Sequence, residues 1–432
     1  MAPEGAFKIG LFYRYMTFIN DELSKLETAL LRECTPRGIL GRFLLSKDGI
    51  NGSFSSTEDG VDSLIDYLRG HDSRFRKIDY KFSYANSGGS IPFNFLAVKM
   101  VNEIIGTGLK AGIDLPPTAF DDNSFGGLSG TGAHLAPRDF HEKVKRIMSG
   151  LERGVILDVR NEYEYDIGHF EGARNLRTYY YSETWKALES TLGQQEQHDD
   201  DDDDDDDIQV LMYCTGGIRC EMASKFAKSK LQRGKVYQLE GGIHRYLEAY
   251  SASEDCLFRG KNFVFDATVS TTDSDSNSRS SGGEKAINSG GAGEKKEVVG
   301  KCIDCSAPHE VYSGKNCCTV CRYPILVCTQ CVDENSHNGE IIYEFYCKRH
   351  RYLKNAFYTV LSRFSESELH QQRILLQELL ANPPSLSNSR RKTVNKQIRR
   401  IDDAINNDSG KHGGDKKNPQ LMINRTGGFW QA

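Results

Sequence analysis

Residues 210–226 read VLMYCTGGIRCEMASKF, a short apolar run that ends in a cysteine and continues into two glycines, an arginine and a helix-like pattern. The apolar run predicts a buried strand, and Cys214 follows it at the carboxyl edge, where open parallel sheets place their ligand sites. Gly216 and Gly217 permit a tight turn, so that loop amides and the N-terminus of the next helix converge on the sulfur. Such a loop favours the thiolate, which is the form that nucleophilic and redox cysteine chemistry require.

The same stretch contains a cation. Arg219 lies five positions after Cys214, and we expect it to add a permanent positive charge at the mouth of the loop. We expect the residues between them to form a cradle for an anionic or sulfur-bearing adduct: Thr215, Gly216, Gly217 and Ile218. The alternative is a buried structural thiol, because free cysteines are among the most buried residue types. The order of strand, cysteine, glycines, arginine and helix favours a catalytic cysteine over that alternative.

The regions around and before this loop predict two domains of different class. Residues 135–266 alternate the strand-like segments GVILDVR, VLMYC and KVYQL with helical patterns, which predicts an α/β domain with a parallel sheet. Within it, the mutual repulsion of nine consecutive aspartates predicts a disordered insertion over residues 193–207. Residues 1–110 follow the order strand, helix, strand, strand, helix, strand, which predicts an α+β domain of the ferredoxin-like kind. Residues 111–134 are rich in Gly and Pro and are expected to be a linker.

The C-terminal part of the chain changes composition several times. We expect a disordered linker over residues 267–299, a Cys/His zinc-binding module over 300–352, a helical segment over 353–382 and a basic flexible tail over 383–432. Ser365 and Glu368 have the spacing of a capping box and therefore mark the start of the helix.

Four ligand pairs in the zinc-binding module repeat one spacing, in which two residues separate the ligands, as in half of a tetrahedral zinc site. The pairs are Cys302 and Cys305, Cys318 and Cys321, Cys328 and Cys331, and Cys347 and His350. Eight ligands predict two structural zinc ions, which would supply much of the folding free energy, because few large apolar residues surround the ligands. The pairing stays open: sequential sites would join the first pair with the second, and a cross-brace would join the first with the third. Cys317, next to Cys318, is a spare ligand.

The cysteine loop resembles the active-site loop of the rhodanese superfamily, in which four residues separate the cysteine from the arginine. Cysteine phosphatases resemble it too but have five residues there. A second landmark, LDVRNEYEYDIGHFEGARN at residues 157–175, is similar to the N-terminal signature of the rhodanese fold. The resemblance implies a rhodanese-like domain in which Asp158 and Arg160 support the site from the end of a strand.

A narrower resemblance rests on four motifs in order, SKDGINGSFS, GAHLAPRDFH, YCTGGIRCEMAS and FVFDATVS. Together they look like the bacterial tRNA uridine hydroxylase family over about residues 7–268. The resemblance implies that Cys214 is the essential residue, Arg219 the loop cation and Cys220 a candidate second thiol. It also implies oxygen-dependent 5-hydroxylation of the wobble uridine, with tRNA as partner and molecular oxygen as co-substrate. The chain departs from the family in its aspartate run, in LFRGKN before FVFD, and in a C-terminal half that looks more like eukaryotic rhodanese-domain relatives.

Two other functions fit the same residues. A persulfide sulfurtransferase would use Cys214 to attack a sulfane sulfur donor and pass on the outer sulfur atom. A non-catalytic rhodanese and zinc scaffold would bind other proteins, although inactive rhodanese modules typically lack the cysteine that this chain retains. The loop permits sulfur transfer as readily as hydroxylation, and the first domain is what favours tRNA.

Composition limits the class of protein. The 432 residues contain no apolar run near the roughly 20 residues that span a bilayer, and the start of the chain lacks signal-peptide and transit-peptide features. We therefore expect a cytoplasmic protein without membrane segments, in which twelve reduced cysteines serve metal binding or catalysis. The net charge of -5 becomes +4 once the nine aspartates are set aside. Residues 385–432 hold ten Lys and Arg against four Asp, so the tail could contact an anionic partner such as RNA or be a solvated tail. The oligomeric state is not predicted.

Overall fold

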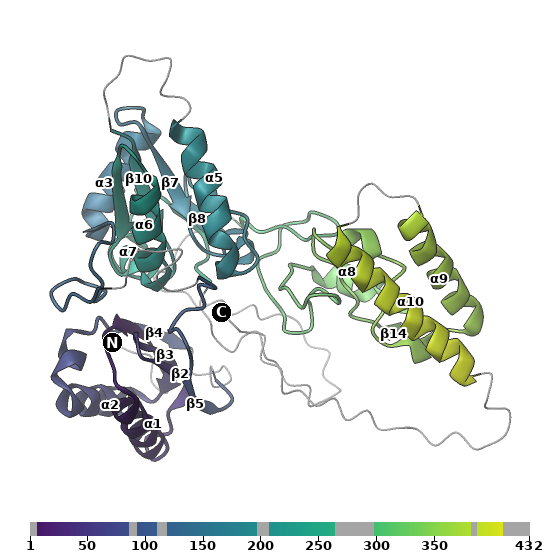
Figure 1. Ribbon diagram of the computed structural model, residues 1–432, viewed down its shortest axis with the longest axis horizontal. Coiled ribbons are helices and arrows are strands. Elements are labelled where there is room, and N and C mark those ends of the chain that lie inside the picture. Colours follow the sequence, from purple (N-terminus) through teal and green to yellow (C-terminus); the bar gives the residue numbers. More distant parts are fainter. Residues whose placement is uncertain are drawn as a thin grey trace. The chain divides into compact units, whose positions relative to one another are not determined.

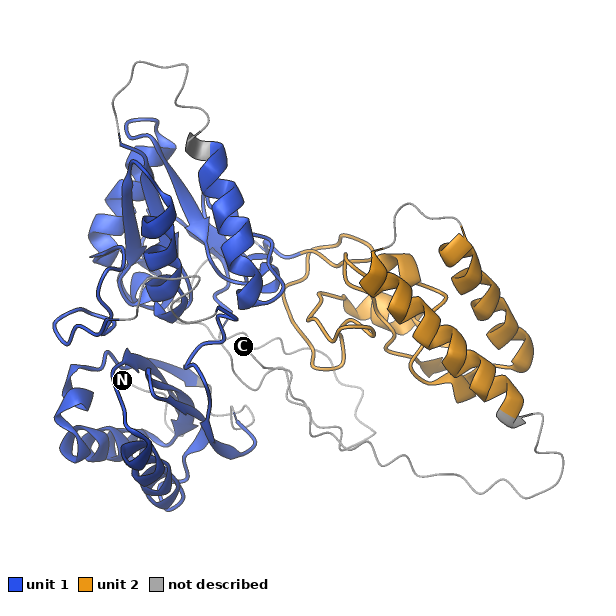
Figure 2. Ribbon diagram, in the orientation of Figure 1, with its two compact units in different colours: residues 1–300, 432 blue, residues 301–431 orange. Residues whose placement is uncertain are grey.

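The computed structural model describes residues 7–85, 93–109, 119–196, 207–263, 298–337, 339–381 and 387–408. The chain divides into two compact units, residues 1–300 together with 432, and residues 301–431 (Figure 2). The first unit contains two domains, and the second contains the cysteine cluster and two long helices (Figure 1). None of the described helices is long and apolar enough to cross a membrane.

The first domain is a sheet with two helices packed on one face (Figure 1). Its elements are β1 (Phe7–Tyr15), α1 (Asn20–Cys34), β2 (Leu40–Ser46), β3 (Gly49–Ser56), α2 (Glu58–His71), the 3-10 helix η1 (Ser73–Lys77), β4 (Lys81–Ala85) and β5 (Leu96–Met100). The strand order is β4-β1-β3-β2-β5, and all neighbours are antiparallel except β2 and β5. This arrangement confirms the predicted ferredoxin-like fold.

Both helices of this domain are amphipathic. Leu23, Leu26 and Leu30 recur along α1, and Leu64 and Leu68 along α2, at the spacing that puts side chains on one helical face. These leucines join the aromatic rings of the sheet in one buried cluster. The apolar core therefore lies on one face of the sheet, which leaves the other face of β1 and β4 for other contacts.

Residues 119–132 lie in the predicted linker but make specific contacts with both domains. The backbone N–H of Tyr15 donates to the carbonyl oxygen of Gly126 at 3.0 Å, and the Arg14 guanidinium donates to neighbouring carbonyls of this segment. At its other end, the N–H of Gly132 donates to Ser224 Oγ at 2.8 Å. The described part of the predicted linker thus joins the two domains through hydrogen bonds.

The second domain is built on a parallel sheet with the order β6-β11-β10-β7-β9. Its elements are β6 (Ala133–Leu135), α3 (Pro137–Met148), β7 (Gly154–Asp158), α4 (Glu162–Tyr165), β8 (Gly168–Phe170), β9 (Arg174–Asn175), the 3-10 helix η2 (Tyr181–Glu183), α5 (Thr184–Glu196), β10 (Gln209–Tyr213), α6 (Ile218–Lys230), β11 (Lys235–Leu239), α7 (Gly242–Tyr250) and β12 (Phe258–Gly260). Helices cover both faces, so the central strand β10 is buried almost throughout. The predicted α/β domain is confirmed.

Two predicted disordered segments lie mostly outside the described residues. Of the predicted insertion 193–207, residues up to 196 continue helix α5 and residue 207 precedes β10, whereas 197–206 are not described. Of the predicted linker 267–299, only residues 298 and 299 are described.

The second unit combines an irregular cysteine-rich region with a pair of helices. Its elements are α8 (Thr329–Glu334), β13 (Ser336–His337), β14 (Glu340–Ile341), the 3-10 helices η5 (Arg351–Leu353) and η6 (Leu361–Arg363), α9 (Glu366–Ala381) and α10 (Asn388–Asp408). The predicted capping box is present, because Ser365 N and Oγ donate to a Glu368 carboxylate oxygen at 2.7 and 2.8 Å and Glu368 N donates to Ser365 Oγ at 3.4 Å. Helix α9 therefore begins at residue 366, and the prediction of a helix from residue 353 is wrong for 353–365, where turns and short 3-10 segments precede the cap.

The expected flexible tail over 383–432 differs from the structure, because residues 388–408 of it form helix α10. The physical reason is an apolar stripe: Val394 and Ile401 are fully buried and pack with Leu369 and Leu376 of α9. These contacts outweigh the charge of the segment, which had suggested a solvated chain.

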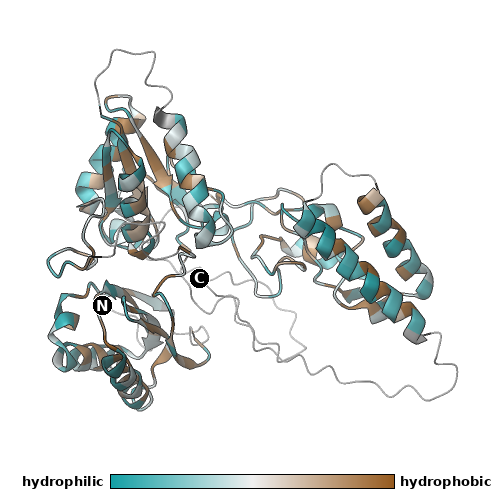
Figure 3. Ribbon diagram, viewed as in Figure 1, coloured by the Kyte–Doolittle hydropathy of each residue, from teal (hydrophilic) through white to brown (hydrophobic). Residues whose placement is uncertain are grey.

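Strands of the parallel sheet are coloured largely as hydrophobic in Figure 3, whereas α10 shows long hydrophilic stretches.

Candidate active site and metal centres

Cys214 lies in a short loop between β10 and α6, at the carboxyl end of the central strand. The four predicted cradle residues make up this loop and the first position of α6, and three of them are buried. Gly217 has a φ of 103°, in the left-handed region, and its backbone N–H donates to Cys214 Sγ at 3.1 Å. The loop therefore has the geometry that the sequence predicted.

The start of α7 fixes this loop from the neighbouring strand connection. The backbone N–H of Ile243 donates to the carbonyl oxygen of Cys214 at 2.9 Å, and that of His244 donates to Thr215 at 3.1 Å. Gly242 has a φ of 67°, and a Cβ atom there would lie 2.5 Å from the Cys214 carbonyl oxygen. Only glycine fits this approach, so the segment GGIH is part of the site.

The environment of Cys214 stabilises its thiolate. Complete burial alone would raise the pKa of the thiol, because a charge is costly without solvent. Hydrogen bonds from the Cys220 thiol, the positive charge of Arg219 and the backbone N–H groups of Cys220 and Gly217 outweigh burial and lower the pKa to about 6. Cys214 is consequently ionised in most molecules at neutral pH.

Arg219 differs from its expected position at the mouth of the loop, because its guanidinium is buried in an ion pair. It donates to the two carboxylate oxygens of Glu164, at 2.5 and 2.7 Å, and to Thr215 Oγ1 at 3.1 Å. Burial favours neutral Glu164, but the Arg219 charge holds the pKa of this carboxyl below its usual value. The pair keeps a permanent cation beside Cys214 without exposing it.

Glu164 is a site residue that the sequence analysis missed. It belongs to the short helix α4, whose residues are part of the quoted signature 157–175. The available signal was a carboxylate six residues after Asp158 in a segment already connected with the loop. A buried guanidinium needs an anionic partner, and that requirement singles out Glu164 once Arg219 is known to be buried.

Asp158 and Arg160 form a second buried ion pair one strand away from the loop. Arg160 Nη2 donates to Asp158 Oδ2 at 2.6 Å and to the carbonyl oxygen of Gly168 at 2.7 Å. Asp158 is the register partner of Tyr213, the residue that precedes Cys214. The pair thus fixes the end of β7 beside the strand that carries the cysteine, and its supporting role stays a prediction.

Cys220, the candidate second thiol, is fully buried in the first turn of α6 next to Cys214. Burial, the hydrogen bond to Cys214 and the negative charge of that thiolate all raise the pKa of Cys220 well above its ordinary value. Cys220 is therefore a neutral thiol that donates a hydrogen bond to the Cys214 thiolate.

The first domain contributes residues to this site that the sequence did not predict. Tyr13 of β1 donates from its hydroxyl to Glu221 Oε1 at 3.0 Å, and a Cβ on Gly217 would lie 2.8 Å from that hydroxyl oxygen. Lys81 of β4 is 1% exposed, pairs with Asp79 at 2.8 Å and interacts electrostatically with Cys214. Since these residues lie more than a hundred positions before the loop, no local pattern connects them with it.

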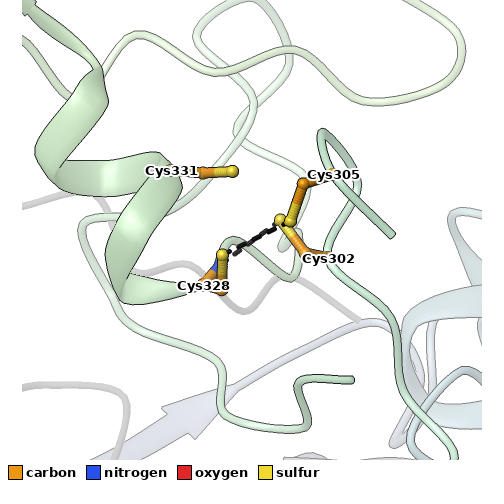
Figure 4. A group of neighbouring side chains, drawn as sticks. All are labelled: Cys302, Cys305, Cys328 and Cys331. Carbon is orange, nitrogen blue, oxygen red and sulfur yellow. Dashed lines mark hydrogen bonds between the residues drawn. The ribbon is translucent and has the colours of Figure 1, made fainter. Parts of the chain in front are cut away.

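The eight predicted metal ligands form two groups. Cys302, Cys305, Cys328 and Cys331 make the first (Figure 4), and Cys318, Cys321, Cys347 and His350 make the second. In each group all ligand atoms lie within 4.8 Å of one another. The first pair is joined to the third and the second to the fourth, so the structure selects the cross-brace from the two pairings that the spacing left open.

The separations of the ligand atoms suit a tetrahedral ion. Sulfur atoms about 2.3 Å from a tetrahedral centre are about 3.8 Å apart. The Sγ atoms of Cys305 and Cys328 are 3.6 Å apart, and those of Cys321 and Cys347 are 3.9 Å apart. Both groups can therefore hold a metal ion with four protein ligands.

The two metal centres repeat one local design. Cys302 N–H donates to the carbonyl oxygen five residues later at 2.8 Å, and Cys318 N–H does the same at 2.8 Å. The residue after each first CxxC pair, Ser306 or Arg322, has a φ of 63° and donates back to the first cysteine of the pair. Cys317 is buried beside this second turn but is not a member of either ligand group.

Three protein families match the chain in the order of its domains. They are described as UPF0176 acylphosphatase like domain, over residues 7–104, Rhodanese-like domain, over 141–249, and Rhodanase C-terminal, over 259–348.

Individual relatives extend this result. A tRNA uridine(34) hydroxylase of Mesorhizobium japonicum is 32% identical over 272 residues, which are 63% of this chain and 76% of the relative. Another, from an Arthrobacter species, is 32% identical over 327 residues, 75% of this chain and 94% of the relative. Rhodanese-like domain-containing protein 6 of Arabidopsis thaliana is 28% identical over 364 residues, 80% of this chain and 54% of the relative.

Proposed function

The chain belongs to the tRNA uridine(34) hydroxylase family, and on that premise we propose that it hydroxylates carbon 5 of the wobble uridine in tRNA. Cys214 is the catalytic residue of this proposal, and molecular oxygen is the co-substrate. One oxygen atom enters carbon 5 and the other leaves as water, with two electrons and two protons from an external reductant such as a small thiol. The observation that carries the proposal is the geometry of Cys214, whose Sγ accepts a hydrogen bond from the Gly217 N–H at 3.1 Å in a loop fixed by α7 and by the Arg219 ion pair.

The surroundings of Cys214 give the neighbouring residues distinct roles. Arg219, held by Glu164, and the Cys220 thiol keep the sulfur ionised at neutral pH. The loop amides face the sulfur, where they would stabilise negative charge that develops on a bound group. Asp158 and Arg160 support the strand end and are positioning residues.

The first domain contributes to the same site in this proposal. Tyr13 and Lys81 cover the cysteine loop, and the Lys81 ammonium faces the Cys214 charge. A closed, charged site of this kind excludes water and strengthens every electrostatic interaction inside it. The family models match the first and second domains of this chain in that order, and a bacterial tRNA uridine(34) hydroxylase matches 75% of it, which supports this shared site.

The two ligand groups are proposed to bind structural zinc. Three or four thiolates per site suit zinc, and four protein ligands complete a tetrahedral shell without a position for substrate. When bound, zinc would fix the loops around each site. The expectation that few large apolar residues surround the ligands is wrong, because several between the ligand pairs are buried: Tyr323, Ile325, Leu326, Val327 and Phe345. The catalytic chemistry is assigned to Cys214 alone.

Persulfide sulfur transfer is the second candidate, and the same thiolate favours it. Cys214 would attack the outer sulfur of a sulfane donor such as thiosulfate, sulfite would leave, and a Cys214 persulfide would remain. The loop amides are suited to an outer sulfur that carries charge.

The test compares tRNA nucleosides, by mass spectrometry, from cells that lack the protein and from cells rescued with wild type or Cys214→Ser. Loss of 5-hydroxyuridine derivatives that only wild type restores is the expected result. Unchanged nucleosides, together with turnover of thiosulfate by the purified protein, would establish sulfur transfer in place of hydroxylation.

A further inference from the structure

Helix α10 has an apolar face that explains its folding. Val394, Ile398, Ile401 and Ile405 recur at spacings of three and four and belong to the same hydrophobic cluster as the leucines of α9. Val394 and Ile401 are fully buried. This face is therefore committed to the second unit and is not available to a partner.

Three of the six cations of α10 also serve the fold. Arg400 donates to the carbonyl oxygen of Thr359 at 2.6 Å, and Arg390 lies over the Tyr352 ring at 5.1 Å. Arg391 reaches the carbonyl oxygen of Leu380 at 3.5 Å, near the end of α9. Their positive charge is used to hold the helix against the rest of the unit.

The other three cations, Lys392, Lys396 and Arg399, form what we term the basic stripe. All three are exposed, and within the part of the chain that the structure describes no carboxylate lies within ion-pair distance of them. Spacings of four and three residues place them on one side of the helix. Val394 and Ile401 follow Lys392 and Arg399 by two residues, about 200° around the axis, so the stripe points away from the apolar face.

The basic stripe contributes nothing to folding that the structure shows. Like charges at spacings of three and four destabilise an isolated helix, because the side chains are neighbours on its surface. Asp402 and Asp403 lie three and four residues after Arg399, but among the described residues Asp402 pairs with Arg373 and neither carboxylate lies within ion-pair distance of Arg399. Lys392 and Lys396 have no acidic residue at these spacings. An anionic partner along the stripe would remove this cost.

We propose that the basic stripe binds the phosphate backbone of the tRNA substrate. The inference rests on the proposed function, which supplies tRNA as the polyanion that this chain must hold. The three cations span eight residues, about 10 Å of helix, which suits contact with two or three successive phosphates. Such contacts position a nucleic acid without reading its bases.

The basic stripe lies in a part of the chain that no matched family covers. The last of the three matches ends at residue 348, before α9 and α10 begin. The proposed tRNA contact thus lies outside the matched domains, and it increases the affinity for substrate without taking part in the reaction.

The test uses the full-length protein with the triple variant Lys392→Gln, Lys396→Gln and Arg399→Gln. A matched control removes three exposed lysines of the rhodanese-like domain, Lys186→Gln, Lys228→Gln and Lys235→Gln, so both variants lose the same charge. The dissociation constant for an unmodified tRNA transcript is measured by fluorescence anisotropy at several salt concentrations. Circular dichroism and metal content establish that both variants are folded.

The basic stripe variant is expected to bind tRNA about 10- to 100-fold more weakly at 0.1 M salt. The slope of log affinity against log salt concentration should fall in magnitude by about two. The dissociation constant of the control variant should change less than about threefold. KM for tRNA should rise by a similar factor and kcat should stay unchanged. Equal weakening of both variants, or none in the first, would overturn the inference. So would a loss of binding to anionic lipid vesicles while tRNA binding is kept. If wild type binds tRNA but forms no 5-hydroxyuridine, the proposed function is wrong. The comparison of tRNA binding between the two variants still tests the basic stripe in that case.

Discussion

The chain uses cysteine in two ways, and a comparison of the two regions shows what each requires from the fold. Cys214 is a single thiolate that a strand, a turn and a helix stabilise through amides, a thiol and a buried cation. In the second unit, seven cysteines and a histidine form two groups that could hold a metal ion, and zinc is the proposed positive partner of their thiolates. Packing of the folded domain therefore positions Cys214, whereas in the second region metal binding is proposed to supply much of the folding free energy.

The largest expected difference between the two regions is their response to a chelator. Removing the metal should unfold the cysteine-rich part of the second unit, because structural zinc contributes on the order of 10 kcal/mol or more of apparent binding free energy. The rhodanese-like domain has its own apolar clusters and should stay folded. Hydrogen exchange with mass spectrometry measures both in one experiment. Retained protection of residues 301–353 after complete metal removal would show that this region folds without metal and would contradict the proposed difference between the two regions.

The next effect concerns the buried ion pair beside Cys214. Glu164→Gln removes the carboxylate that pairs with the buried Arg219 guanidinium and leaves the Cys214 thiolate as a buried anion beside it, and the loss of a buried ion-pair partner costs about 3–5 kcal/mol of unfolding free energy. Denaturant titration of the two variants checks this. The matched control is Glu189→Gln, which removes an exposed partner of Lys230 and should cost at most about 1 kcal/mol. Similar stability of the two variants would show that Arg219 does not depend on Glu164.

A smaller effect is expected from the loss of the hydrogen bond that the Cys220 thiol donates to Cys214. Cys220→Ala removes the side-chain hydrogen bond to Cys214 and should raise the pKa of Cys214 from about 6 toward its ordinary value. Because the folded-state pKa is depressed, the thiolate fraction rises as pH rises through about 6 in wild type, and this rise moves to higher pH in the variant. Ultraviolet thiolate absorbance, taken as the difference from Cys214→Ser, measures the midpoint. Cys220→Ser retains a donor and should keep the midpoint near that of wild type.

The smallest effect belongs to the metal region. Ser306 has a φ of 63°, a conformation that side chains other than glycine adopt at a cost. Ser306→Gly should therefore stabilise the metal-bound module by about 0.5–1 kcal/mol, as followed by the thermal midpoint of the second unit. Ser306→Ala keeps the unfavourable conformation and should give no gain. Equal thermal midpoints for the glycine and alanine variants would show that the positive φ at Ser306 does not destabilise this turn.

Local patterns predicted the elements that local forces determine. The apolar strand before Cys214, the glycine turn and the CxxC spacing each act within a few residues, so the sequence alone placed them correctly. The pairing of the ligands, by contrast, depends on how the chain folds back over dozens of residues, and spacing could not choose between sequential sites and a cross-brace.

The residues that the sequence missed owe their place to tertiary structure. Glu164 is a partner only because Arg219 turns inward, and Tyr13 and Lys81 reach the loop only because β1 and β4 of the first domain pack over it. Helix α10 is a different case. Its apolar residues at spacings of three and four could be recognised in the sequence as a helical pattern, but the charge of the surrounding residues suggested a flexible tail.

The most direct test of the central claim is a reaction of purified protein with a tRNA transcript that contains an unmodified wobble uridine, in the presence of isotopically labelled oxygen gas and a thiol reductant. Mass spectrometry of the nucleosides follows the product. We predict labelled 5-hydroxyuridine at the wobble position with wild type and none with Cys214→Ser. Product formed at the same rate by Cys214→Ser would contradict the claim that this thiolate carries the reaction.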